Sequence, residues 1–168
     1  MTVTLASIVS GYDAGLATLD HLLSRGADHC AEHGLCENET LEWKLAPDMF
    51  SFRQQAQAVC KLAAQWPARV AEIDVPPTIE GATDVAQLHE AIAQTRSFLN
   101  LFPAEQLNSR ADVPFTFDLG AIAPTLPVSR WIIGFTTTNF HFHLSIAYAI
   151  LRARGVPLGK PDLFAGGL

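Results

Sequence analysis

The stretch at residues 136–155, TTTNFHFHLSIAYAILRARG, most narrows the folds that this chain can adopt. It holds the densest apolar content of the sequence, and Gly155 stands where a C′ glycine ends a helix. We therefore expect a long, buried helix that begins at residue 127 or 128 and ends at Arg154, with a bend at its three consecutive threonines. Such a helix must bury its apolar face against other elements, and an all-α bundle is the fold that we expect.

Three further segments show the spacing of amphipathic helices, with apolar residues three and four positions apart. They predict helices at residues 4–33, 51–73 and 84–102, the last with Asp84 as its N-cap. Together with the C-terminal helix they predict one four-helix-bundle domain over residues 1–168, a length that a single core readily spans.

Glycines mark two features of the first predicted helix. Gly15 and Gly26 lie inside it, although glycine costs ~1 kcal/mol relative to alanine in a helix interior. We expect these two positions where the helix comes close to a neighbour. Gly34 follows the predicted helix directly and is expected to end it.

The connections between the helices lack helical spacing. Residues 36–50 predict a loop or short extended segment that lays Trp43 on the bundle. In the middle of residues 103–127, apolar and polar residues alternate, which predicts a short strand or hairpin packed on the outside of the bundle. The Pro/Gly-rich tail is expected to pack through Leu163 and Phe164.

Composition and charge limit the partners. Hydrophobic residues make up 49% of the chain and charged residues 17%, which leaves room for an apolar surface patch and favours a homodimer. The net charge is −6 and the eleven Lys and Arg residues form no run, so we expect no nucleic-acid partner. No apolar run reaches the ~18 residues that cross a bilayer, and no secretory signal opens the chain. We expect a cytoplasmic protein without a membrane partner.

Helical geometry separates the two histidines of the FHFH sequence. Residues two positions apart point ~200° apart around a helix, so His141 and His143 cannot share a face. His143 falls on the same row as Phe140 and Ala147, which should face the core. Two interpretations of His143 stay open. It is either a buried neutral imidazole held by a hydrogen bond, or a metal ligand or acid/base group in a pocket.

A second histidine pair lies near the end of the first predicted helix. His29 and His33 are four residues apart, which is the local spacing that lets two imidazoles meet one metal ion, and Cys30 and Cys36 are close by. The alternative is that the helix dipole alone favours histidines at this end. We expect no cofactor, and a divalent metal at His29 and His33 or at His143 is the alternative.

Two stretches resemble an uncharacterised bacterial family. LAPDMFSFRQQAQ (residues 45–57) and NFHFHLSIAYAILRARGVPLGKPD (residues 139–162) are similar to the domain-of-unknown-function family DUF1993, within the DinB-like superfamily. The resemblance covers essentially the whole chain and implies a four-helix bundle with up-down-down-up topology. The link at residues 74–83 permits it, because ten extended residues reach ~33 Å, about the length of a twenty-residue helix.

The resemblance also implies where a metal would bind. Many DinB-like proteins carry three histidine ligands, one from the second helix and a pair four residues apart from the fourth, and some are metal-dependent thiol transferases or hydrolases. This chain has no histidine in residues 51–73, and His143 has Asn139 and Ala147 at the neighbouring positions of its row. At most one of the three ligands is present. We expect no three-histidine metal site.

The resemblance suggests one candidate site for a small-molecule ligand. We expect it at the end of the bundle where Trp43, Asp48, Asn139 and His143 converge. His143 would be the acid/base group or ligand, Asp48 its orienting carboxylate and Asn139 a polar anchor. The leading expectation is a small-molecule binding or dimeric interaction module. The alternatives are a divergent metal-dependent hydrolase or transferase that uses His143 and Asp48, and a purely structural dimer.

Overall fold

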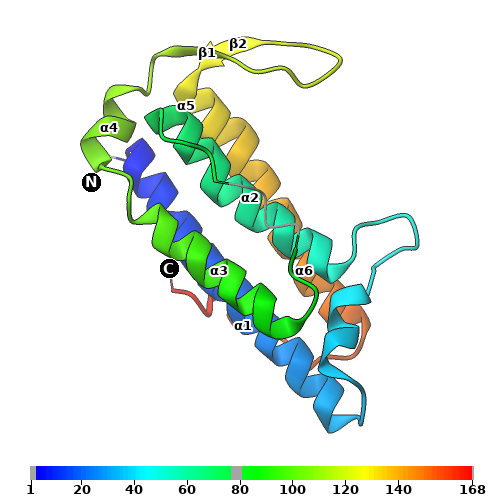
Figure 1. Cartoon of the computed structure of the whole chain (residues 1–168). Helices are drawn as coiled ribbons and strands as arrows, with labels where there is room; N and C mark the ends of the chain where they lie inside the picture. The colour runs from blue at the N-terminus through cyan, green and yellow to red at the C-terminus, as the bar shows by residue number, and fades with distance from the viewer. Residues whose placement is uncertain (1–2, 77–80, 168) are drawn as a thin grey trace.

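A 28-residue helix, α1 (Leu5–Glu32), forms one long side of the bundle in the computed structural model, which describes residues 3–76 and 81–167 (Figure 1). Its first turn is closed by a capping box. The Ser7 amide donates to the Thr4 hydroxyl, at 3.2 Å, and the Thr4 amide donates to the Ser7 hydroxyl, at 2.9 Å. This fixes the start of α1 one residue from the predicted position.

Three further long helices complete the bundle. They are α2 (Phe52–Ala71), α3 (Val85–Leu99) and α6 (Thr137–Ala153); the shorter elements are a 3-10 helix (Glu37–Glu42), α4 (Ala104–Ser109), strands β1 (Pro114–Thr116) and β2 (Thr125–Pro127), α5 (Val128–Arg130), a π-helical turn (Trp131–Thr136) and a second 3-10 helix (Lys160–Phe164). The three segments α5, the π-helical turn and α6 follow one another without a break, so they form the single long C-terminal helix that the sequence predicts. The π-helical turn ends where the three threonines begin, at the predicted bend.

N-caps mark the starts of α2 and α3, and a glycine follows the end of α1. Ser51 accepts a hydrogen bond from the Gln54 amide at the start of α2, and Asp84 accepts one from the Gln87 amide at the start of α3. Gly34, after α1, has φ +69°, a left-handed conformation that glycine adopts without strain. It lets the chain leave α1 and turn towards α2.

The helices run up, down, down and up. The start of α3 lies beside the segment before α2, because the Val85 amide donates to Asn38 Oδ1 at 2.9 Å. Helix α4, which follows the far end of α3, lies beside the end of α2, because the Gln106 side chain donates to the Ala71 carbonyl. Helices α2 and α3 are therefore parallel, as Figure 1 shows, and α1 and α6 run the other way. The link between α2 and α3 includes residues 77–80, which lie outside the described residues.

The close approach expected at the two glycines of α1 is confirmed. A Cβ atom on Gly15 would overlap the ring of Phe140, and one on Gly26 would lie 2.6 Å from Thr40 Cγ2 and 2.9 Å from Leu151 Cδ2. Phe140 and Leu151 both belong to α6. The absent side chains thus let α1 and α6 pack tightly along their length.

An aromatic cluster fastens the predicted hairpin to one end of the bundle. Strands β1 and β2 are antiparallel, with Phe115 opposite Leu126. The Trp131 indole N–H donates to the Phe115 carbonyl at 2.8 Å, and Trp66 of α2 stacks on Trp131 with ring centroids 5.2 Å apart. Phe117 packs against Trp66 at 4.9 Å. The alternating pattern in residues 103–127 therefore does mark a hairpin on the outside of the bundle.

Two expectations about the connections need correction. The short helix α4 was not predicted, because it buries only Leu107 and so shows no helical spacing. In the tail, Phe164 is exposed, whereas Leu163 is half-buried and its carbonyl accepts from the Thr18 hydroxyl. Val156 and Leu158 are the buried apolar side chains of this region. Trp43 does lie on the bundle as expected and is 9% exposed.

Within residues 3–76 and 81–167, no helix combines the length and the apolar character that crossing a bilayer requires.

Candidate functional site

His143 is half-buried on the side of α6 that meets α2. Its Nδ1 atom lies 2.7 Å from Oε1 of Gln55, and the Gln55 amide N–H donates to the Phe50 carbonyl at 3.4 Å. An amide oxygen only accepts, so Nδ1 of His143 carries the hydrogen and Nε2 keeps its lone pair. Burial lowers the pKa of His143 below its usual value. The imidazole is therefore neutral near pH 7.

An aromatic ring covers this imidazole from the loop that precedes α2. Phe50 stacks on His143 with ring centroids 6.2 Å apart and planes 15° apart. Its loop is closed by a bridge between Lys44 and Ser51. Phe50 itself is 50% exposed. The surroundings of His143 thus agree with the first interpretation, a neutral imidazole held by a hydrogen bond, although the partner is an amide.

The structure places the other predicted site residues in separate surroundings. Asp48 is exposed in the turn before α2, and the position expected for its carboxylate beside His143 is taken by the Gln55 amide. Asn139 donates to the Phe135 carbonyl within its own helix, at 2.7 Å. The predicted pairing of His143 with Asp48 is therefore wrong.

Trp43 lies at another level of the bundle. Its ring meets His29 edge-on at 6.3 Å, and the Arg154 guanidinium lies 5.8 Å over it. Arg154 is eleven residues after His143, which is ~16 Å along a helix. The four residues Trp43, Asp48, Asn139 and His143 do not form the single site that we expected.

The side chains around His143 do not fit a three-histidine metal centre. Helix α2 contains no histidine, and the residues four positions before and after His143 are Asn139 and Ala147. Across residues 3–76 and 81–167, one group of three metal-ligating side chains has its donor atoms within 4.8 Å of one another. That group is His29, Glu32 and His33, at the end of α1. This group lies at the end of α1 and does not include His143.

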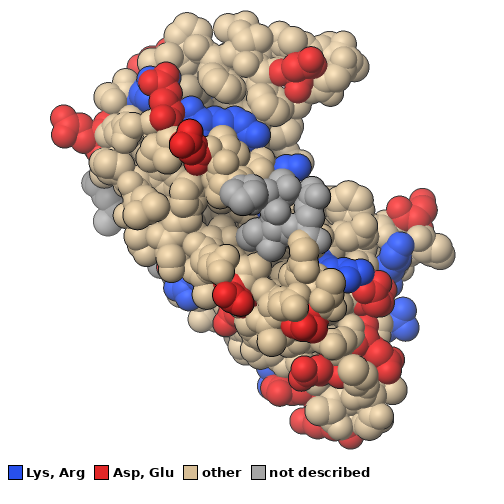
Figure 2. Space-filling view, in the orientation of Figure 1, with Lys and Arg blue, Asp and Glu red and all other residues tan. Residues whose placement is uncertain are grey.

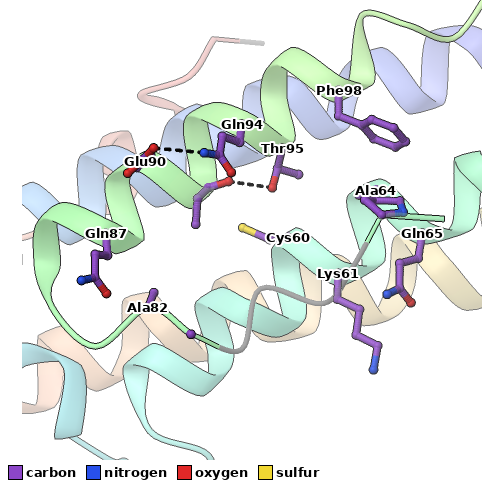
Figure 3. Close-up of a pocket in the computed structure, with 13 residues that line it drawn as sticks. Cys60, Lys61, Ala64, Gln65, Ala82, Gln87, Glu90, Gln94, Thr95 and Phe98 are labelled. Carbon is purple, nitrogen blue, oxygen red and sulfur yellow. Dashed lines mark hydrogen bonds between the residues drawn. The ribbon is translucent and has the colours of Figure 1, made fainter. Parts of the chain in front are cut away.

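A cavity of about 490 Å³ lies between α2, α3 and the link that joins them, from which Pro76, Gly81 and Ala82 line it (Figure 3). Ala64 and Phe98 contribute to its largely apolar wall. Lys61 lines it from α2, and Glu90 and Gln94 line it from α3, where the Gln94 side chain donates to Glu90 at 3.1 Å. Volume and lining are those of many small-molecule sites, apolar with a few polar groups.

The thiol beside this cavity, that of Cys60, is buried and weakly acidic. Cys60 points from α2 towards Thr95 of α3 (Figure 3). Burial raises the pKa of the Cys60 thiol to about 12. Since the thiolate is the nucleophilic form, Cys60 does not serve as a nucleophile near neutral pH. The hydroxyl of Thr95 donates to the Ala91 carbonyl at 2.8 Å and is likewise occupied.

Three residues of these sites were not singled out from the sequence. Gln55 is a buried polar residue three positions after Phe52, on the apolar row of α2, and that misfit was a visible signal. Glu32 follows His29 by three residues and precedes His33, so its place on the same helical face was also visible. The stacking of Phe50 on His143 had no local signal, because it joins a loop to a helix far along the chain.

Comparisons with known proteins identify relatives of this chain. A family profile described as "Domain of unknown function (DUF1993)" matches residues 6–164. The crystal structure of a DinB family member protein from Shewanella denitrificans is similar over 95% of this chain and 91% of that chain, with a TM-score of 0.88 and 24% sequence identity. At that identity the likeness shows the fold alone. No curated protein matches this sequence.

Proposed function

Since the chain belongs to the DUF1993 family of DinB-like helical bundles, we propose that it acts as a dimeric interaction module in which two copies meet through the outer face of α6. The observation that supports this proposal is that the C-terminal helix has no charged residue over most of its length. Residues 131–151 contain no Asp, Glu, Lys or Arg. A helix that faces water on one side usually carries charged residues there.

The outer face of α6 is apolar or weakly polar along its length. We define this α6 face by five residues that share one side of the helix and its π-helical turn: Ile133, Thr138, Phe142, Ser145 and Ala149. Ile133 and Phe142 are each 53% exposed. Burying two large apolar side chains of a neutral helix against a partner lowers the free energy, because apolar surface is removed from water.

A second copy of this chain is the partner that suits this face. Two copies with net charge −6 repel each other, so they associate most readily through a face that has no acidic residue. A two-fold interface brings the same face of each copy together, and a neutral face meets no like charge. The small residues Ser145 and Ala149 allow the two α6 helices to come close.

The area that a stable dimer needs extends beyond one helix. A standard interface buries roughly 800 Å² on each partner, and α6 with its π-helical turn is ~35 Å long. The loop that carries Phe50 projects from the side of the bundle near α6 (Figure 1). Its exposed Phe50 and Leu45 are available to enlarge the buried area.

Light scattering over a concentration series tests this proposal. We expect the native chain to have the mass of a dimer and Phe142→Glu or Ile133→Glu to have the mass of a monomer, because a buried carboxylate opposes association. Leu101→Glu is the matched control. Leu101 is 62% exposed after α3, away from the α6 face, and its substitution should leave the dimer intact. A native chain that stays monomeric, or equal effects of Phe142→Glu and Leu101→Glu, would exclude this dimer.

We also propose small-molecule binding in the cavity between α2 and α3, supported by its volume of about 490 Å³ and its largely apolar wall. Anilinonaphthalene sulfonate, a fluorescent apolar probe, should bind once per chain, and Ala64→Trp should block it by filling the cavity from α2. Gln94→Trp fills the cavity from an exposed position and serves if Ala64→Trp does not fold. Ser145→Trp on the α6 face is the control. Probe binding that survives both cavity substitutions would exclude this site.

A further inference from the structure

Three side chains with metal-ligating atoms share one turn at the C-terminal end of α1. The donor atoms of His29, Glu32 and His33 lie within 4.8 Å of one another. Residues spaced by three and four positions are neighbours on a helix surface. Ligands of a tetrahedral zinc ion are about 3.3 Å apart, given bonds of about 2.05 Å. A small rotation of these solvent-accessible side chains therefore closes the three donors around one ion.

A hydrogen bond already selects the ligating form of His33. Its Nδ1 atom is 2.8 Å from the His29 carbonyl oxygen. A carbonyl oxygen only accepts, so Nδ1 carries the hydrogen and Nε2 has the free lone pair that a metal needs. In protein metal sites, a ligating imidazole commonly donates its second N–H to a carbonyl or carboxylate in this way. Without any metal, His33 has the arrangement of a ligand.

Buried contacts hold the backbone beneath these side chains. The Leu35 amide donates to the Cys30 carbonyl at 2.8 Å, across the left-handed Gly34. Cys30 is ~100° around the helix from His29 and is fully buried, with Sγ 3.2 Å from the Thr40 hydroxyl. The edge of Trp43 supports the ring of His29. These contacts hold the backbone at the end of α1 in place. Cys30 is not among the accessible metal-ligating side chains.

The segment around the end of α1 is acidic; the basic groups that reach it from other elements are Arg154, which lies over the ring of Trp43, and Arg53, which pairs with Glu42. Between Arg25 and Lys44 the chain has no Lys or Arg. It carries five acidic residues there: Asp28, Glu32, Glu37, Glu39 and Glu42. Figure 2 shows acidic side chains gathered over the end of the molecule where α1 ends and α3 begins. A concentration of one charge sign raises the local concentration of the opposite ion.

We propose that His29, Glu32 and His33 bind one divalent transition-metal ion, of the kind of Zn²⁺ or Ni²⁺. Two imidazole nitrogens and one carboxylate oxygen suit these ions better than Mg²⁺ or Ca²⁺, which take oxygen ligands. Three protein donors leave at least one coordination position for water. The site uses none of the residues of the α6 face or of the cavity.

Titration of tag-free protein with NiCl₂ and ZnCl₂ tests this site. We expect calorimetry to give one saturable site per chain at micromolar metal. Nickel should also quench the fluorescence of Trp43, whose ring centroid is 6.3 Å from that of His29, and the quenching should saturate at the same metal concentration as the heat of binding. Binding should weaken as the pH falls below about 6, because protonated imidazoles do not ligate metals.

Substitutions identify the ligands. His29→Phe keeps a ring against Trp43 but removes the donor, and it and His33→Ala should each weaken binding by at least roughly tenfold, the loss that even an outer-shell change can cause. Glu32→Gln should weaken binding more than Glu39→Gln, which makes the same charge change at an exposed position nearby. His141→Ala controls for the loss of a histidine elsewhere, and Phe142→Glu should bind the metal as the native chain does.

Three outcomes would overturn the proposal: no saturable binding at micromolar metal, undiminished binding when His29→Phe and His33→Ala are combined, or equal effects of Glu32→Gln and Glu39→Gln. Circular dichroism of each variant shows whether it is folded. These results are independent of the mass measured for the native chain, so failure of the metal site and failure of the dimer are distinguishable.

Discussion

Gly15 sets how closely α1 approaches α6. Its missing side chain leaves room for the ring of Phe140, which is fully buried and packs on Tyr12 with centroids 4.9 Å apart. We expect Gly15→Ala to lower the free energy of unfolding by about 1–3 kcal/mol, the usual cost of overpacking a core. Urea denaturation measures this difference.

Gly11 provides the matched control one turn earlier in α1. A Cβ atom there meets nothing within 4 Å. Gly11→Ala should raise the free energy of unfolding by up to about 1 kcal/mol, because alanine is the better helix former. If both substitutions stabilised the chain equally, the tight contact between α1 and α6 would not exist in solution.

His143 should make the fold weaker in mild acid. Burial lowers its pKa, and also that of His141, below the ordinary value of 6.5. The unfolded chain then takes up protons at a higher pH than the folded chain does. The free energy of unfolding therefore decreases as the pH falls below about 6.5, until the folded form is protonated as well. Comparing urea denaturation at about pH 7.5 and about pH 5.5 in the native chain and His143→Gln measures this, because the variant should lose less stability. An equal loss in both would contradict the assignment.

The sequence could identify His143 as a special residue, but its partner could not be chosen from spacing. His143 and Gln55 are 88 positions apart, and their meeting depends on how α6 and α2 rotate about their axes. Asp48 was the attractive carboxylate in the sequence, yet the turn that holds it leaves it in water. The sequence shows which side chains share one face of a helix. Contacts between faces of different helices depend on how the helices pack, which the sequence does not show.

At the scale of elements, the C-terminal tail is fastened to α1 by a small polar cluster. Asp162 accepts from the Gly159 amide at 2.7 Å and lies 2.8 Å from His21 Nε2, and the Gly166 amide donates to the Thr18 hydroxyl at 3.1 Å. The Gly159 amide and then His21 lower the pKa of Asp162. The carboxylate therefore stabilises the docked tail above its ordinary pKa of 3.8, and this contribution is lost as the pH falls through the lowered value.

Hydrogen exchange of the tail amides measures that contribution. Asp162→Ala should speed exchange in residues 159–166 at neutral pH, because it removes the bond from Asp162 to His21 of α1 and the Gly159–Asp162 bond within the tail. Asp112→Ala removes the same charge from an exposed position outside the tail and should leave these amides unchanged. Equal exchange in the two variants would mean that apolar contacts alone dock the tail.

The long helices and the hairpin were predictable, whereas the short helix α4 was not. Helices α1, α2 and α3 each show several turns of apolar spacing, and their start residues also carry caps, so two signals agreed. Helix α4 has six residues and one buried side chain, too few to show a period. The expectation that the tail packs through Phe164 failed for another reason. Its largest apolar residue, Phe164, is exposed, since docking there relies on hydrogen bonds and on Val156 and Leu158 before it.

At the scale of the whole molecule, charge and apolar surface are kept apart. Acidic residues crowd the end of the bundle where α1 stops, while residues 131–151 carry no charge. The all-α class was predictable from four periodic segments, whereas the up-down-down-up order was implied by the family resemblance and only permitted by the length of the link. The two proposed surfaces were not predictable, because both depend on which sides of the helices remain uncovered after packing.

This separation gives the proposed dimer a distinctive response to salt. The α6 faces meet without ion pairs, so salt has no attraction to weaken there, whereas each copy carries a net charge of −6 that repels the other. The screening length falls from ~30 Å at about 0.01 M salt to ~8 Å at about 0.15 M. We therefore expect added salt to strengthen the dimer, measured as a fall in its dissociation constant by sedimentation equilibrium. Phe142→Glu should remain monomeric at both concentrations. A dimer that dissociated on addition of salt would instead be held by charge pairs, and the α6 face would not be its interface.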